Sequence, residues 1–228
     1  MKILGLNHGE INAAAALVVD GEVVAGAAEE RFTREKKTKD FPINAVRYCL
    51  EAGGLEWEEV DAVAQAWNPG RPGSSSIRWS PAAASTAEND LYAIPDNLYR
   101  LTERETDEWV KMSFPDGSAM PPVYHIQHHR THSANSFYLS EFEEAAILTA
   151  DWRGEFETTT LGMGSGNSFE ILASQNMPHS LGAFYAAFTE LLGYQPDSEE
   201  WKVMALSAYD VDASDFYQKI RRYGPPSR

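Results

Sequence analysis

The sequence predicts an α/β protein made of two similar halves, and three observations support this prediction. Short apolar runs typical of strands alternate with helical patterns along the 228 residues. The order strand, turn, strand, strand, helix occurs twice. No sequence repeat of short fixed period is present, which favours a duplicated fold unit over a solenoid.

The first half opens with three strands and a helix. The Asp20-Gly21 pair between two apolar runs is a strong hairpin signal. The helix is expected to end at Gly53-Gly54, and the single cysteine, Cys49, falls in its helical pattern and is expected in the core. The predicted elements are strands at 2–6, 13–19, 22–28 and 60–66 and a helix at 43–52.

The middle of the chain changes in character. Residues 68–86 are rich in Pro, Gly, Ser and Ala and predict a loop, whereas residues 89–112 show weak helical periodicity. We therefore place the first half at residues 1–140, with a loop excursion at 68–120. The elements predicted after the periodic stretch are a loop at 114–122, a short buried strand at 122–126 and a helix at 129–139.

The second half, residues 141–228, repeats the opening order. Phe184, Tyr185 and Phe188 have helical spacing and are expected in its core. No strands follow to finish the sheet, so we expect this half to be incomplete. Unpaired sheet edges and bare apolar patches then predict dimerisation or marginal stability. The predicted elements are strands at 145–150, 158–163 and 169–173, a turn at 164–167, and a helix at 180–192 closed by Gly193.

The composition argues against several classes of protein. There are 19 Lys and Arg against 34 Asp and Glu, a formal net charge of −15. This balance argues against nucleic-acid binding, which relies on basic patches. A single cysteine rules out an intramolecular disulfide and a CxxC zinc site. No signal-peptide pattern and no apolar run of about 18 residues is present, so we expect no membrane contact and a cytoplasmic location.

A histidine cluster is the densest chemical feature, since four of the six histidines lie between residues 125 and 132. On a helix His128 and His132 are i and i+4, so both rings lie on one face and can hold one metal ion. Asp151 follows a predicted strand and is a natural third ligand. Two imidazoles and a carboxylate form a facial site with open positions, suited to a divalent metal such as iron or zinc. The alternative is that these histidines are chance or capping residues.

Two polar turns have the composition of phosphate-binding loops. In Asp151–Glu155, with Arg153, Gly154 and Glu155, a strand end leads into a glycine turn whose N–H groups can form an anion nest. The turn at Gly5–Asn12 precedes a run of small residues that lets a ligand approach the backbone. Such a turn in each half would face one cleft, as in the actin-like and sugar-kinase-like ATP-binding folds. The alternative for the first of these turns is an ordinary acidic hairpin turn.

A local basic run interrupts the acidic sequence and is a candidate phosphate-binding patch. For most of its members a solvated helix face is the competing interpretation. The run consists of Arg31, Arg34, Lys36, Lys37 and Lys39.

Five stretches together resemble the N-terminal domain of the carbamoyltransferases of antibiotic and nodulation-factor biosynthesis. That domain is similar to the universal tRNA threonylcarbamoyl-adenosine synthase. The resemblance implies an actin-like fold of two ribonuclease-H-like halves. The stretches are LGLN with AAAALVVDGEVVAGAAEERFTR, HHRTH, DWRGE with TTT, PHSLGAFYAAFTELLGY, and EEWKVMALSAYD.

The resemblance implies an enzyme that uses ATP and carbamoyl phosphate to make carbamoyl-adenylate and passes the carbamoyl group to a hydroxyl of a small-molecule acceptor. In the family a separate C-terminal domain forms the adenylate, so such a domain is an expected partner. The family's metal ligands fall on His128, His132 and Asp151, and a further aspartate is expected beyond these 228 residues. The family's conserved lysine falls on Lys36.

The sequence departs from the family at several positions. The family's His-Asp pair, whose histidine is considered the general base, is replaced by Ile11-Asn12. His8, three residues earlier, is the candidate substitute, with Glu10 as a second, while Lys36 would offset developing phosphate charge. Trp152, Ala205 and Asp210 stand where glycine is common.

Two other functions stay open at this point. A non-catalytic or split subunit would bind nucleotide or acceptor and need a partner chain. This is favoured by the missing family histidine and by the early stop. A small-molecule kinase on the same fold is the weaker option, because no acceptor-side motif supports it.

Overall fold

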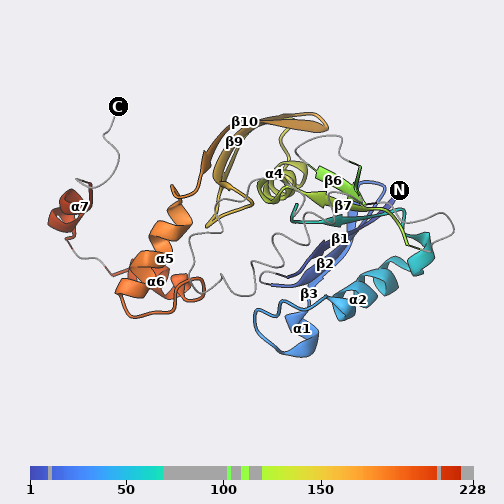
Figure 1. Ribbon diagram of the computed structural model, residues 1–228, viewed down its shortest axis with the longest axis horizontal. Coiled ribbons are helices and arrows are strands. Elements are labelled where there is room, and N and C mark those ends of the chain that lie inside the picture. The colour runs from blue at the N-terminus through green and yellow to red at the C-terminus, as the bar shows by residue number, and fades with distance from the viewer. Residues whose placement is uncertain (10–11, 69–101, 104–108, 113–119, 210–211, 222–228) are drawn as a thin grey trace. The chain divides into compact units, whose positions relative to one another are not determined.

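The computed structural model describes residues 1–9, 12–68, 102–103, 109–112, 120–209 and 212–221 (Figure 1). The chain divides into two compact units, residues 1–181 and 182–228. This boundary separates two compact parts of the chain, and it does not test whether the chain consists of two similar halves. The predicted halves, 1–140 and 141–228, therefore stay a prediction. The α/β class is confirmed by the mixed sheets and helices of the first unit.

A seven-stranded mixed sheet forms one part of the first unit. Its strand order is β3-β2-β1-β4-β7-β6-β5, with β4 parallel to both β1 and β7. The hairpin predicted at Asp20-Gly21 is confirmed, because both residues adopt the positive φ angles, 51° and 92°, that a tight turn between β2 and β3 requires. The strands are β1 (Lys2–Asn7), β2 (Ala14–Val19), β3 (Glu22–Ala28), β4 (Ala62–Gln65), β5 (Thr102–Glu103), β6 (Trp109–Met112) and β7 (Val123–Ile126).

The core of this part lies between the sheet and helix α2 (Ile43–Gly53), which follows the single-turn helix α1 (Glu30–Thr33) and packs on β2 and β3. Cys49 is fully buried there, as predicted. The start of α2 is capped from outside the helix. The carboxylate of Glu29, only 2% exposed, accepts the N–H groups of Asn44 at 3.1 Å and Ala45 at 2.8 Å.

A three-stranded antiparallel sheet forms the other part of the first unit: β8 (Glu144–Ala150), β9 (Glu157–Ser165) and β10 (Ser168–Asn176), in the order β10-β9-β8. Helix α4 (His128–Tyr138) packs on one face (Figure 1). Phe137 of α4 is buried there with Ile147 and Phe169. This packing places the first turn of α4 beside the end of β8, which is where the candidate site lies.

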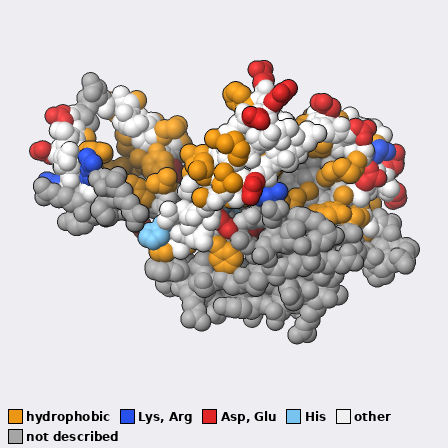
Figure 2. Space-filling view, turned by 90° about the horizontal axis from the view of Figure 1, so that it is seen from above, with side chains coloured by type: hydrophobic (Ala, Val, Ile, Leu, Met, Phe, Trp, Pro, Cys, Tyr) orange, Lys and Arg blue, Asp and Glu red, His pale blue; other side chains and the backbone are white. Residues whose placement is uncertain are grey.

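The other face of this small sheet is apolar and exposed. Leu148 is 69% exposed and its cross-strand neighbour Leu161 is 46% exposed. Figure 2 shows apolar side chains at the surface among acidic ones. The expectation of dimerisation or marginal stability rests on such surface and stays a prediction.

The second unit consists of helices α5, α6 and α7. The prediction that Phe184 and Tyr185 lie in the core is wrong, because these side chains are 52% and 38% exposed. Phe188 is only partly buried, and the positions of α5 buried within the chain are Ala186 and Thr189. Short helices without a sheet bury little of an aromatic stripe. The helices are α5 (Leu181–Leu191), α6 (Glu200–Leu206) and α7 (Ser214–Arg221).

The helix indicated by the weak periodicity at 89–112 is wrong for the residues of that stretch that the structure describes. Residues 102–103 and 109–112 are strands, and β6 pairs with β7. Pairing with a neighbouring strand outweighs weak local periodicity. The remainder of that stretch, and nearly all of the predicted excursion at 68–120, lies outside the described residues. Within the described part of the chain, no helix is both long and apolar enough to span a bilayer.

Candidate metal centre

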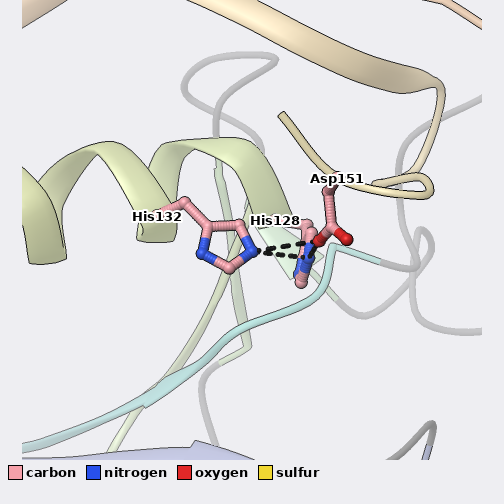
Figure 3. A group of neighbouring side chains, drawn as sticks. All are labelled: His128, His132 and Asp151. Carbon is pink, nitrogen blue, oxygen red and sulfur yellow. Dashed lines mark hydrogen bonds and ion pairs between the residues drawn. The ribbon is translucent and has the colours of Figure 1, made fainter. Parts of the chain in front are cut away.

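Three side chains converge where α4 begins and β8 ends (Figure 3). The Nε2 atoms of His128 and His132 lie 2.9 and 3.2 Å from Oδ2 of Asp151, and 3.0 Å from each other. The i, i+4 spacing aligns the two rings on α4, and Asp151 directly follows β8. Their ligand atoms all lie within 4.8 Å of one another. The structure therefore brings together the three residues expected from the sequence, while their role as metal ligands stays a prediction.

The position of the ring proton on His128 favours the binding of a cation by its other nitrogen, Nε2. Its Nδ1 lies 3.4 Å from the carbonyl oxygen of Ala66, a contact that assigns the ring proton to Nδ1. The Nε2 lone pair of His128 then faces a carboxylate oxygen and the Nε2 atom of His132. Acceptor atoms that meet in this way need a proton or a metal ion between them.

Asp151 is held in its ionised form. Burial alone favours the neutral acid, but the contacts with the His128 and His132 rings and the hydrogen bond donated by the N–H of Trp152 outweigh burial and hold the pKa of the carboxyl below its ordinary range. Ser180 fixes the turn behind it, since its hydroxyl donates to the carbonyl of Trp152 at 2.6 Å. An anionic oxygen is thus presented to the two imidazoles.

This donor set fits a divalent transition metal. Two imidazole nitrogens and one carboxylate oxygen suit Fe²⁺ or Zn²⁺ and leave coordination positions for substrate. No thiolate takes part, because Cys49 is buried in the core beneath α2. His132 is 47% exposed, so the centre is open to solvent on that side.

The turn after Asp151 supports the start of α4. The half-buried carboxylate of Glu155 accepts the N–H of His128 at 3.0 Å and the N–H of Asn68 at 2.8 Å, and burial raises the pKa of Glu155. Gly154 has no room for a side chain, because a Cβ atom there would lie 2.8 Å from Cδ2 of His129. The guanidinium of Arg153 lies 5.2 Å from the Trp152 ring centroid. The predicted role of this turn in nucleotide binding stays a prediction.

Replacing Glu155 with glutamine should destabilise the protein by about 1–3 kcal/mol. The amide offers one acceptor oxygen in place of two, and its NH₂ group would face a backbone N–H that now donates to the carboxylate. Urea unfolding measures the effect, and Glu141→Gln at an exposed position is the matched control. Equal stability of the two variants would show that the cap is unimportant.

His129 is a buried residue whose role the sequence did not reveal. Its Nδ1 lies 2.6 Å from Oγ1 of Thr149, and its Nε2 lies 2.9 Å from the carbonyl oxygen of Glu157. Thr149 in turn contacts Oγ1 of Thr160 at 2.7 Å. Burial is the main cause that lowers the pKa of His129, which favours the neutral ring. This network ties α4 to β8 and β9 and so positions the neighbouring His128. One signal was present in the sequence: adjacent residues on a helix point about 100° apart, so His129 has to face away from the His128 side.

The candidate residues of the first half lie on two joined loops. Gly9 donates to the carbonyl of Lys39 at 2.9 Å, and Ala13 donates to that of Thr38 at 3.0 Å. His8 stands edge-on to the ring of Phe41, 5.3 Å between centroids, and burial lowers its pKa. The loop that bears His8 and the loop that bears the basic run are thus side by side.

Two other predicted residues of these loops are exposed. Asn12 adopts a φ of 58° and accepts, through its carbonyl, a hydrogen bond from the Asn7 side chain at 3.2 Å. Lys36 extends into solvent and lies 3.3 Å from a carboxylate oxygen of Glu30. Ile11 and the second candidate base, Glu10, lie outside the described residues.

The chain belongs to the family of carbamoyltransferase N-terminal domains. The family model described as Carbamoyltransferase N-terminus matches residues 2–221. Among relatives, an uncharacterised protein of Synechocystis, sll1178, is 35% identical over 91% of this chain and 34% of its own length. The nodulation protein NolNO of Sinorhizobium fredii is 29% identical over 86% of this chain and 27% of its own length. The chain thus spans about a third of the length of these relatives.

Among solved structures, YeaZ from Pseudomonas aeruginosa matches 78% of this chain and 67% of its own. The identity is 16% and the TM-score 0.37. The α/β class therefore rests on the two sheets of the chain itself.

Proposed function

We propose that this chain is the metal-dependent transfer domain of a carbamoyltransferase, with an actin-like fold of two ribonuclease-H-like halves. It acts in the cytoplasm, where ATP and carbamoyl phosphate are available, and passes a carbamoyl group to a hydroxyl of a small molecule. Family membership supports the transfer of a carbamoyl group. The convergence of His128, His132 and Asp151 is the observation that carries the proposal, because three donor atoms that meet at a point open to solvent could hold a metal ion.

The proposed reaction has two steps. In a partner domain, carbamoyl phosphate, ATP and water give carbamoyl-adenylate, pyrophosphate and phosphate. In this chain, the acceptor oxygen attacks the carbamoyl carbon, the bond from that carbon to the AMP phosphate oxygen breaks, and AMP leaves. The acceptor proton passes to a base on the protein.

Each step of the transfer has a candidate residue. His128, His132 and Asp151 would hold a divalent metal ion, and this ion would supply Lewis-acid polarisation of the carbamoyl or phosphate oxygens. His8 takes the acceptor proton through the free lone pair of its neutral ring, a state that its lowered pKa favours. Lys36 offsets the phosphate charge. Nucleotide binds between the turn at 153–155 and the loop of Asn12.

Binding of an adenylate mimic tests the proposal. 5′-O-Sulfamoyladenosine carries an uncharged sulfamoyl group in place of the carbamoyl-phosphate linkage. The chain loaded with Zn²⁺ or Fe²⁺ should bind it at least about tenfold more tightly than adenosine, a difference of about 1.4 kcal/mol. Titration calorimetry measures the affinity. Asp151→Asn should lose the preference, and Asp215→Asn, at an exposed position of α7, should keep it. A preference that is absent, or equal with and without metal, would contradict the proposal.

A split or non-catalytic subunit is the second candidate, favoured by Ile11-Asn12 at the place where the resembled family carries its His-Asp pair. Supplied alone with carbamoyl phosphate, ATP, metal and hydroxylated acceptors, the chain should release no AMP and form no carbamoylated product in mass spectra. Addition of an adenylate-forming partner domain restores turnover if this chain carries out the transfer, and does not restore it if the chain is a non-catalytic subunit. Turnover by the isolated chain would overturn the division into two sites.

A further inference from the structure

We propose that His125 is a positioning residue of the metal centre, which holds Trp67 in place so that the Trp67 ring braces the metal ligand His128. The inference rests on the proposed metal site. It adds a residue that neither touches the metal nor belongs to the HxxxH motif. The chain of contacts runs from His125 at the end of β7, through the segment after β4, to the first turn of α4.

The first contact is a hydrogen bond from His125 to the backbone of Trp67. The Nδ1 atom of His125 lies 3.3 Å from the Trp67 carbonyl oxygen, and a carbonyl can only accept, so the proton sits on Nδ1. The Nε2 atom of His125 is shielded from solvent and has no hydrogen-bond partner among the described residues. Burial also lowers the pKa of His125, which favours the neutral ring. The one described hydrogen bond of this imidazole therefore holds the backbone of Trp67 in place.

The second contact is a stack of Trp67 on His128. The two rings lie 4.2 Å apart between centroids, with an angle of 21° between their planes. A flat, half-buried indole against one face of an imidazole restricts rotation of that ring. It thereby keeps Nε2 of His128 directed at Asp151, 2.9 Å away.

The neighbours of Trp67 are tied to the same centre. The carbonyl of Ala66 accepts from Nδ1 of His128, and the N–H of Asn68 donates to Glu155, which also caps His128. The three consecutive residues 66–68 thus all support the same candidate ligand, His128. Ala66 is held by the candidate ligand His128 itself, and Asn68 is held by the capping residue Glu155. The Trp67 carbonyl is instead held by His125, which is neither a candidate ligand nor the cap, so the effect of His125 can be tested separately.

The inference predicts a specific pattern of metal affinity. Loss of a hydrogen bond behind a metal-ligating histidine weakens metal binding by about 10- to 100-fold. His125→Asn keeps an N–H donor near the position of Nδ1 and should retain affinity within about threefold. His125→Gln has the same amide one bond further out, cannot donate to the Trp67 carbonyl from the same position, and should lose affinity. The asparagine and glutamine variants are matched in polarity, so any difference between them reports geometry.

The experiment measures Co²⁺ affinity by competition with a chromophoric chelator, together with quenching of Trp67 fluorescence by bound Co²⁺. The chain has six tryptophans, so the Trp67 signal is taken as the difference between each protein and its Trp67→Phe counterpart. In wild type and His125→Asn, Co²⁺ should quench the Trp67 component. In His125→Gln both the affinity and this quenching should fall, with circular dichroism unchanged.

Two outcomes would overturn the inference: equal affinity and quenching in the asparagine and glutamine variants, or lost affinity with the Trp67 quenching intact. The His128→Ala/His132→Ala variant separates this from failure of the proposed function. If that variant binds Co²⁺ as wild type does, the metal site itself is wrong. If it loses Co²⁺ while His125→Gln does not, only the role of His125 fails.

Discussion

The double variant His128→Ala/His132→Ala should bind Fe²⁺ or Zn²⁺ at least about 100-fold more weakly than the wild-type chain, because loss of a single supporting partner already costs about 10- to 100-fold. The two imidazoles supply two of the three donor atoms that meet at this point. A lone carboxylate, Asp151, remains after substitution, and one exposed carboxylate holds such ions weakly.

Elemental analysis of protein purified without chelator, followed by equilibrium dialysis, measures this loss. His179→Ala is the matched control, because His179 is an exposed histidine outside the cluster. The control should keep the wild-type metal content. Equal metal content in the double variant and the wild type would remove His128 and His132 as ligands.

Replacement of His129 with leucine should lower the free energy of unfolding by about 1–3 kcal/mol, since each of the two hydrogen bonds lost contributes about 0.5–1.5 kcal/mol. His129 is fully buried and makes these bonds with the hydroxyl of Thr149 and the carbonyl of Glu157. Both groups keep one other partner, Thr160 and the N–H of Gly154 respectively. Leucine fills similar volume and can hydrogen-bond to neither.

A double-mutant cycle with Thr149→Val isolates the coupling between the two side chains. Because His129→Leu and Thr149→Val remove the same hydrogen bond, the combined variant should be less destabilised than the sum of the single variants by about 0.5–1.5 kcal/mol. Urea unfolding followed by circular dichroism gives each value. Additive effects would show that the imidazole and the hydroxyl do not depend on each other.

The sequence predicted the elements whose signals are local. The Asp20-Gly21 hairpin, the helix ended by Gly53-Gly54 and the strand before Asp151 all appear, because turn chemistry and periodicity act over a few residues. The spacing of His128 and His132 likewise fixes their common face on α4. The meeting of these rings with Asp151 followed from the strand end, and the structure places all three together.

The features that the sequence did not reveal depend on distant partners. The support of His128 comes from Ala66 and Trp67, which precede it by some sixty positions in the numbering of the chain. The helical periodicity near residue 109 gave way to strand β6, which pairs with β7. The apolar stripe of Phe184 and Tyr185 indicated burial, yet the two side chains are 52% and 38% exposed. Local patterns carry no information about which surface a side chain meets.

All three donor atoms come from one contiguous stretch, residues 128–151, that consists of a helix, a short connection and a strand. Closing so short a loop costs little chain entropy, whereas the pairing of β1 with β4 has to bring Ile3 to Ala62. Contacts between near neighbours in sequence also form faster than distant ones. The ligand geometry is therefore expected to assemble as soon as α4 docks on β8, early on the folding pathway. Metal captured at that stage would act as a nucleus on which the longer-range sheet condenses.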